Sequence, residues 1–377
     1  MHQKNILFFL NKIGSGGSEQ YLYLLAKHAL KNNNKVTFIS NGGNKKEYLE
    51  DIGAKVINLP MITIGKDNIS DLSIKQRIFL KFYLLIKYLY IFYLYISIGK
   101  PDVIISQHGF PTIIAQHVAN FFKIKNYNLV HHILPNEYTD IYKQLSLEPY
   151  IHIAVSEEIR DFLYAKNIKN CYVLPNPIDF DLITPIFLDA KNKNFTKKNI
   201  TIVSHIHEDK AENLLAISAI SKMPRFLDCK FNICGDFNNE WGYDYYNKNN
   251  GNLNFLGNLS TLDLYKMISS SDVILGVGRC AMESLALGKN TIISGHVRGV
   301  NGGNYSGVVK PEMLDRIAYY NYSGRSESLV VSIDKLEKDI ASLIYEKIDN
   351  KAIVDYIKNK HDSEVIYNTL VDIIKNG

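Results

Sequence analysis

A glycine-interrupted apolar run in the second half of the chain offers the clearest setting for chemistry. Residues 273–275 (Val-Ile-Leu) are typical of a buried strand, and Gly276 and Gly278 break the run. A helix is expected over about 279–287, because apolar residues recur there at helical spacing and a glycine follows as a natural stop. Residues 290–294 return as a strand. The pattern predicts strand, tight loop, short helix, strand.

The start of that helix is suited to bind an anion beside a pair of hydroxyl groups. The first backbone N–H groups after the Gly278 turn have no partners within the helix, and the helix dipole favours negative charge there. They belong to Arg279, Cys280 and Ala281. Glu283 stands about one turn further on, where a carboxylate can accept two hydrogen bonds from a vicinal diol. Phosphate and diol together are what a nucleotide presents. The alternative is that Glu283 only complements the helix dipole, an effect of a few tenths of a kcal/mol.

Residues 278–289, Gly-Arg-Cys-Ala-Met-Glu-Ser-Leu-Ala-Leu-Gly-Lys, resemble the nucleotide-binding helix of glycosyltransferase family 4. That family has the GT-B architecture of two Rossmann-like domains facing each other across a cleft. The resemblance implies that Glu283 holds the donor ribose. The family's other glutamate, which contacts the donor sugar, is missing: Leu275 stands eight positions before Glu283. The identity of the donor is therefore left open.

A second glycine loop lies near the start of the chain. A strand, a glycine loop and a helix capped by Ser18 fall within about 35 residues, which is a Rossmann-like opening. A dinucleotide site is disfavoured, because Glu19 takes the place of the third glycine and Asn41 follows the second strand. The resemblance implies that Gly16 and Gly17 lie by the acceptor and the donor phosphates. The alternative is a tight turn only.

Histidines follow two successive strands of the first half. His108 ends one, and His131 with His132 ends the next. Ligands of open parallel sheets bind beyond the carboxyl ends of strands, although a lone histidine is usually structural. The resemblance implies a catalytic-site histidine at the second position that contacts the donor sugar. His132 is favoured there over His131.

The second half begins with a strand and a polar turn. The resemblance implies an arginine and a lysine in this turn, which neutralise the donor diphosphate. Lys210 matches the lysine, but His205 stands in place of the arginine. Arg298 or Arg325 is a candidate for the missing cation, against the alternative that each is an ordinary surface arginine.

The length of 377 residues suits two domains of ordinary size. We expect an N-terminal Rossmann-like acceptor domain over 1–180, a linker over 181–199 and a C-terminal donor domain over 200–351. A last helix, 352–375, is expected by analogy with the family to pack back on the first domain. The fold class is α/β.

Residues 72–98 are apolar enough on paper to span a bilayer. Lys81 and Lys87 interrupt the segment, so packing on a sheet is the first interpretation. Contact with a membrane interface comes second and a true span last.

Composition narrows the remaining possibilities. A hydrophobic content of 46% and a charged content of 21% describe a soluble globular protein. The net charge of +5 suits nucleotides or an acidic membrane surface and is too small to indicate nucleic-acid binding. The four cysteines lack metal-ligand spacing and favour a reducing cytoplasm, and Ile6 to Leu10 is too short for a signal peptide. No metal site is expected.

The resemblance implies a retaining glycosyltransferase that needs neither metal nor cofactor. It would move a sugar from UDP- or GDP-sugar to a glycan or lipid-linked glycan in surface polysaccharide synthesis, such as lipopolysaccharide or capsule. Lys210 and the N–H groups near Cys280 would stabilise the leaving diphosphate. It would lie in the cytoplasm, with peripheral contact at the inner membrane face. The alternatives are a non-catalytic scaffold and a nucleotide-sugar epimerase.

Overall fold

The computed structural model describes most of the chain in fourteen ranges or single positions. They are residues 3–14, 16–43, 45–59, 75, 78, 87–107, 109–133, 150–190, 198–237, 239–249, 251, 253–295, 304–345 and 350–376. The chain divides into two compact units. The first unit is Met1–Pro177 together with Ser363–Gly377, and the second is Ile178–Asp362.

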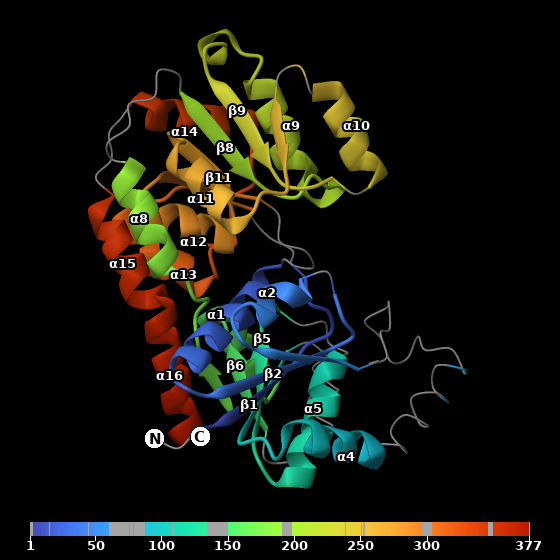
Figure 1. Ribbon diagram of the computed structural model, residues 1–377. Coiled ribbons are helices and arrows are strands. Elements are labelled where there is room, and N and C mark those ends of the chain that lie inside the picture. Colours follow the sequence, from blue (N-terminus) through green and yellow to red (C-terminus); the bar gives the residue numbers. More distant parts are fainter. Residues whose placement is uncertain are drawn as a thin grey trace. The chain divides into compact units, whose positions relative to one another are not determined.

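The first unit is built on a seven-stranded parallel sheet of order β3-β2-β1-β4-β5-β6-β7 (Figure 1). Its strands are β1 Asn5–Phe9, β2 Lys35–Ser40, β3 Lys55–Asn58, β4 Val103–Gln107, β5 Asn126–Val130, β6 Tyr150–Ala154 and β7 Cys171–Val173. Every residue of β4, β5 and β6 is buried. A parallel sheet is covered on both faces, which explains why these strands are dominated by apolar residues.

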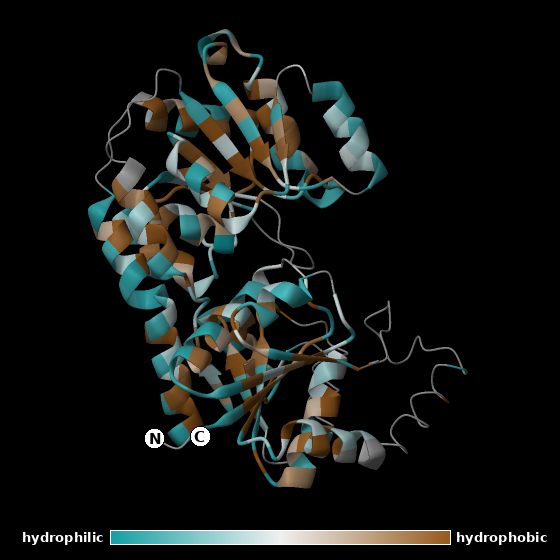
Figure 2. Cartoon of the chain, viewed as in Figure 1, coloured by the Kyte–Doolittle hydropathy of each residue, from teal (hydrophilic) through white to brown (hydrophobic). Residues whose placement is uncertain are grey.

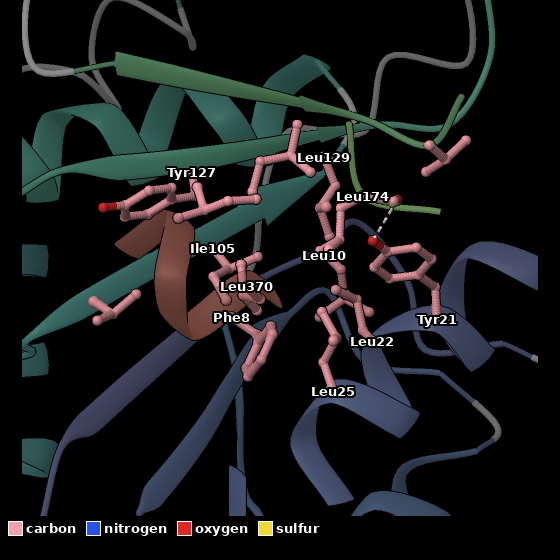
Figure 3. Packing of buried hydrophobic residues seen from close by; sticks show 14 of the residues in the cluster. Phe8, Leu10, Tyr21, Leu22, Leu25, Ile105, Tyr127, Leu129, Leu174 and Leu370 are labelled. Atoms are coloured by element: carbon pink, nitrogen blue, oxygen red, sulfur yellow. Dashed lines mark hydrogen bonds between the residues drawn. The ribbon is translucent and has the colours of Figure 1, made fainter. Parts of the chain in front are cut away.

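Alternation along β1 assigns helices to the two faces of this sheet. Ile6 and Phe8 belong to a core that includes α1 and α16, whereas Leu7 and Phe9 belong to a core with α4 and α5. Figure 3 shows the first of these cores, in which Phe8 and its neighbours lie among side chains of α1 and Leu370 of α16. The helices of the unit are α1 Gly17–Lys31, α2 Lys46–Glu50, α4 Lys87–Ile98, α5 Gly109–Phe122, α7 Glu157–Ala165 and α16 Ser363–Asn376.

One expectation for the first unit is wrong, and another, packing of the apolar segment on a sheet, is confirmed for the described residues. Helix α1 is capped by Gly16 and not by Ser18, whose hydroxyl donates to Glu19 instead. The apolar segment 72–98 is described as a helix from Lys87 to Ile98, packed on the sheet through Ile91 and Leu94. Most of its earlier residues lie outside the described ranges. None of the described helices is long and apolar enough to cross a bilayer.

The second unit contains a six-stranded sheet of order β10-β9-β8-β11-β12-β13 (Figure 1). Its strands are β8 Asn199–Val203, β9 Lys230–Cys234, β10 Asn254–Gly257, β11 Val273–Gly276, β12 Asn290–Ser294 and β13 Tyr305–Val308. Only the edge strand β13 is antiparallel to its neighbour. Each unit is therefore Rossmann-like, as expected.

Alternation again separates two cores in the second unit. Ile200 and Ile202 of β8 pack with α9 and α14, whereas Val203 packs with α8, α11, α12, α13 and α15. Figure 2 shows hydrophobic residues along the central strands and a hydrophilic α10. The helices are α8 Phe180–Ala190, α9 Ala211–Ile220, α10 Glu240–Asn249, α11 Thr261–Ser269, α12 Arg279–Ala286, α13 Leu314–Tyr319, α14 Ile333–Tyr345 and α15 Lys351–His361, with the 3₁₀ turns η1 Glu208–Lys210, η2 Pro224–Phe226 and η3 Pro311–Met313.

Two expectations for the second unit are corrected. The expected linker 181–199 begins with most of helix α8, which belongs to the unit because Ile183 is buried in its core. The single helix expected over 352–375 is two helices, since Asp362 has a non-helical ψ of 127° between α15 and α16.

Candidate functional site

The order of strands in the second unit reverses between β8 and β11. In open α/β sheets, ligands bind in the crevice beyond the carboxyl ends of the strands at such a switch point. The loop after β8 carries His205, and the loop after β11 carries Gly278 and the start of α12. The topology therefore gathers these predicted residues at one edge of one sheet.

Two glycines allow the loops at this edge to approach each other. A Cβ on Gly235 would lie 2.0 Å from the carbonyl oxygen of Ser204, so the turn after β9 tolerates no side chain there. A Cβ on Gly276 would lie 3.3 Å from Cβ of Cys280 and 3.7 Å from the carbonyl oxygen of Val203. The backbone is thus closely packed around the ends of β8, β9 and β11.

Gly278 sets the direction of α12. Its φ of 58° and ψ of −127° are unfavourable for any residue with a side chain. Its N–H donates to the carbonyl oxygen of Tyr322 at 2.6 Å, a contact that fixes the loop. Arg279 is then the first helical residue, as the sequence predicts. The first N–H groups of α12 have no intrahelical acceptors, and the helix dipole favours an anion beside them.

Glu283 lies inside the second unit and already has two hydrogen-bond donors. Arg279 Nε lies 2.8 Å from Glu283 Oε1, and the hydroxyl of Tyr265 in α11 donates to the same oxygen at 3.0 Å. The side chains of Arg279 and Glu283 are 13% and 6% exposed. Burial raises the pKa of Glu283, while Arg279 and Tyr265 oppose that rise. The predicted ribose contact of Glu283 stays a prediction, and in this structure the carboxylate is covered.

Cys280 and Ala281 contribute backbone and packing at this position. Ala281 is fully buried, and burial raises the pKa of the Cys280 thiol to about 12. The thiol is therefore protonated at neutral pH and is no nucleophile. The chemistry available here is anion binding by N–H groups.

His205 is fixed by a partner that the sequence analysis did not consider. Its Nδ1 contacts Oδ1 of Asp236, from the turn after β9, and its side chain is 77% exposed. The N–H of Ile206 also donates to the carbonyl oxygen of Asp236 at 2.9 Å. Lys210 lies at the end of η1, directly before α9, and is half-buried. His205 and Lys210 thus flank one short turn beyond β8.

The two candidate arginines differ in what the structure describes. Arg325 is half-buried and follows Gly324, where a Cβ would lie 2.8 Å from the carbonyl oxygen of Asn304. Gly295, at the end of β12, donates its N–H to the same carbonyl group. Arg325 therefore lies in a turn beside the carboxyl end of β12. Arg298 lies outside the described residues.

Comparison with known proteins finds one family similar to the first part of this chain. The model of Glycosyltransferase Family 4 matches residues 15–182. No curated protein matches the sequence. That stretch of the chain is therefore similar to glycosyltransferase family 4.

Solved structures agree on the fold. A glycosyltransferase from Rickettsia africae aligns with a TM-score of 0.72 at 15% identity, over 100% of this chain and 98% of that chain. HepE of Anabaena, solved in complex with UDP and glucose, aligns with a TM-score of 0.65 at 15% identity, over 100% of both chains. Sucrose-phosphate synthase from Thermosynechococcus elongatus aligns with a TM-score of 0.67 at 13% identity, over 99% of this chain and 98% of that chain. The chain thus has the GT-B fold.

In the first unit, the two candidate histidines that the structure describes have different surroundings. His131 is half-buried, its Nε2 lies 2.9 Å from Oε1 of Gln107, and its ring meets the ring of Tyr21 edge-on at 5.3 Å. Tyr21 donates in turn to the carbonyl oxygen of Leu174 at 3.0 Å (Figure 3). His132 is exposed. His108 lies outside the described residues.

Gly16 and Gly17 form the entry to α1 beyond the carboxyl end of β1. Gly16 is the cap residue, and a Cβ there would lie 2.5 Å from Oε2 of Glu19. Since β1 and β4 are neighbours at the strand-order reversal of the first sheet, this loop also lies at a switch point. Its predicted phosphate contact is not tested by the geometry.

Four residues at these sites escaped the sequence analysis. They are Gln107, Asp236, Tyr265 and Tyr322. Gln107 and Asp236 directly follow or end strands, which is a usable signal. The hydroxyl of Tyr265 contacts Glu283 from a neighbouring helix, and the backbone carbonyl of Tyr322 accepts from Gly278. No local sequence pattern reveals either contact. Among the described residues, no three His, Cys, Asp or Glu side chains could hold a metal ion.

Proposed function

We propose that this protein transfers a sugar from UDP- or GDP-sugar to a glycan or lipid-linked glycan acceptor, with retention at the anomeric carbon and without a metal. Its place would be surface polysaccharide synthesis, at the inner face of the membrane. The observation that carries the proposal is the start of α12. A glycine turn delivers the N–H groups of Arg279, Cys280 and Ala281 to the switch point of the second sheet, in a chain of glycosyltransferase fold.

Fixed positive charge supports the leaving-group role. A nucleoside diphosphate leaves more readily when cations and N–H dipoles stabilise the charge that develops on it. Lys210 follows β8 and the N–H groups of α12 follow β11, which are neighbouring strands. HepE, a structural neighbour, is described in complex with UDP and glucose, which favours UDP as the first donor base to test.

The donor-sugar contact is proposed for a histidine after β5. His132 is the exposed member of the pair, whereas Gln107 and Tyr21 already hold His131. A ligand can reach the exposed imidazole from solvent, and the contacts of His131 can orient the loop. We therefore keep His132 as the contact and assign His131 to positioning. Loss of activity in His131→Ala but not in His132→Ala would contradict this assignment.

Peripheral membrane contact is supported by a surface at the ends of α4 and α5. The exposed side chains here, which we call the aromatic surface, are Tyr93, Tyr95, Ile96 and Phe121. The ring of Tyr95 also lies 6.1 Å from that of Phe122. The exposed lysines next to these ends are Lys100, Lys123 and Lys125. Between Asp71 and Glu137 the sequence has a single acidic residue, Asp102. Aromatic tips beside lysines suit an anionic interface.

Vesicle sedimentation tests that contact. The protein should sediment with vesicles containing anionic phosphatidylglycerol, and Ile96→Ser should reduce the bound fraction. Leu227→Ser, which removes an exposed leucine from the second unit, is the matched control. Equal binding by both variants would contradict membrane contact through the aromatic surface.

A donor screen tests the central activity. The protein is incubated with UDP- and GDP-sugars, and released UDP or GDP is measured with and without bacterial lipid-linked acceptors. A transferase releases one diphosphate and transfers the sugar. Interconversion of the donor sugar without an acceptor would identify an epimerase instead. Failure of the chain to bind any of these nucleotides would leave only the scaffold.

A further inference from the structure

The guanidinium of Arg279 is incompletely satisfied. Its Nε contacts Glu283 Oε1, but Nη1 and Nη2 are buried and have no hydrogen-bond partner in the part of the chain that the structure describes. A guanidinium carries five N–H donors, and four of them belong to these two nitrogens. Buried polar groups in native proteins are almost always paired, so this arrangement requires an explanation.

A purely structural ion pair would be expected to look different. Arginine stabilises buried carboxylates best through two parallel hydrogen bonds, which use Nη as well as Nε. Here Arg279 contacts the carboxylate of Glu283 through Nε alone. The arrangement covers the carboxylate of Glu283 but leaves most of the arginine's hydrogen-bonding capacity unused.

The environment of Glu283 indicates what the arginine replaces. Its Oε1 is approached by two donors, the Nε–H of Arg279 and the hydroxyl of Tyr265. A vicinal diol would also offer the carboxylate two donors. Arg279 therefore occupies a place that a ribose hydroxyl can take.

We propose that Arg279 is a mobile cation of the donor site. When the donor binds, its guanidinium leaves Glu283 to the ribose diol and takes phosphate oxygens of the diphosphate with Nη1 and Nη2. Arg279 is placed for this, because it is the first residue of α12 and its own N–H group is among those at the anion-binding end. This inference rests on the proposed function.

The exchange also accounts for the departure at His205. His205 replaces the arginine expected after β8, and it is already in contact with the carboxylate of Asp236. Arg279 carries a permanent charge in the neighbouring loop, with a planar fork that matches phosphate oxygens. The second permanently charged cation is thus supplied from the loop between β11 and α12 and not from the turn after β8.

Calorimetric titration with UDP and uridine tests the exchange, with GDP and guanosine in parallel. Loss of charge-assisted hydrogen bonds in Arg279→Gln should weaken UDP binding roughly 10–100-fold. Binding of uridine, which has the ribose but no phosphate, should stay within about threefold or become tighter, because the competitor for Glu283 is gone. Arg279→Lys should recover part of the UDP affinity. Arg225→Gln, which removes an exposed arginine paired with Glu337, is the control and should change the affinity for neither UDP nor uridine.

A structural role for Arg279 predicts another result. If Arg279 only anchors α12, Arg279→Gln should weaken the binding of UDP and of uridine by the same factor. That outcome would overturn the exchange. Unchanged UDP affinity would overturn it too. If the wild type binds neither UDP nor GDP, the proposed function itself fails. Should Arg279→Gln not fold, the double variant Arg279→Gln with Glu283→Gln removes the uncompensated charge. Its preference for UDP over uridine should be roughly 10–100-fold smaller than that of the wild type, and an unchanged preference would overturn the exchange.

Discussion

At the scale of the residue, the carboxylate of Glu283 accepts from Arg279 and Tyr265 in the protein, and the proposal adds the ribose diol as a further partner. Its position one turn into α12 follows from the sequence, since the glycines and the apolar spacing define the helix. Its burial and its contact with Tyr265 do not, because α11 and α12 meet only in the folded unit. Sequence reasoning thus predicted where the carboxylate stands and missed that it is covered.

Replacement of Glu283 by Gln should separate its two roles. Loss of the charged acceptor should weaken UDP or GDP binding by roughly 1–3 kcal/mol. The same change leaves Arg279 as a buried cation without its carboxylate, which should lower the free energy of unfolding by about 3–5 kcal/mol. Titration calorimetry and urea denaturation measure the two effects. Unchanged nucleotide affinity in a folded variant would remove Glu283 from the site.

His152 in β6 should make the protein sensitive to acid. Burial lowers the pKa of His152 from 6.5 to about 3. Its Nδ1 lies 3.3 Å from the amide nitrogen of Asn128, and in a neutral ring this Nδ1 can accept a hydrogen bond from the amide. Below pH 6.5 the His152 imidazole binds a proton in the unfolded chain but stays neutral in the folded protein. The free energy of unfolding therefore falls as the pH falls.

The acid sensitivity is measurable against a variant. Between pH 7 and 4 the loss from this one group should be roughly 3 kcal/mol. His152→Gln keeps an acceptor for Asn128 and cannot be protonated, so its urea denaturation should show a shallower pH dependence by that amount. Parallel pH profiles of the two proteins would mean that His152 titrates normally in the folded state.

At the scale of the element, the turn before α12 depends on one glycine. Nothing lies within 4 Å of a Cβ on Gly278, so only its backbone conformation opposes a side chain. Gly278→Ala should therefore cost roughly 1–3 kcal/mol of stability through strain and should weaken nucleotide binding by displacing the N–H groups. Gly251→Ala, at a position with equal space and no positive φ, is the control for thermal unfolding and titration. Equal behaviour of the two variants would show that the turn tolerates alanine.

Elements with a clear apolar pattern were predicted closely. The strand expected over 290–294 matches β12, because β-branched and apolar residues are bounded there by turn residues. The helix expected over about 279–287 closely matches α12. Helix α8 was missed because prolines precede it and Pro185 lies within it. Burial of Ile183 and Phe180 outweighs these local signals, which shows tertiary packing overriding propensity.

At the scale of the whole molecule, the sequence predicted two Rossmann-like units from repeated strand, glycine loop and helix patterns. It could not predict where the chain enters and leaves the second unit. The N–H of Ile178 donates to the carbonyl oxygen of His361 at 2.7 Å, a contact between residues far apart in the sequence. Such non-local pairing lies beyond any window of sequence pattern, and for the same reason the last helix was predicted as one and is two.

The most direct test of the account is a crystal structure of the protein with UDP, or with GDP if calorimetry shows that GDP binds more tightly. The account predicts density for the diphosphate within hydrogen-bonding distance of the N–H groups at the start of α12, with the ribose against Glu283 and the guanidinium of Arg279 turned to the phosphates. A nucleotide bound elsewhere, with Arg279 still on Glu283, would contradict it.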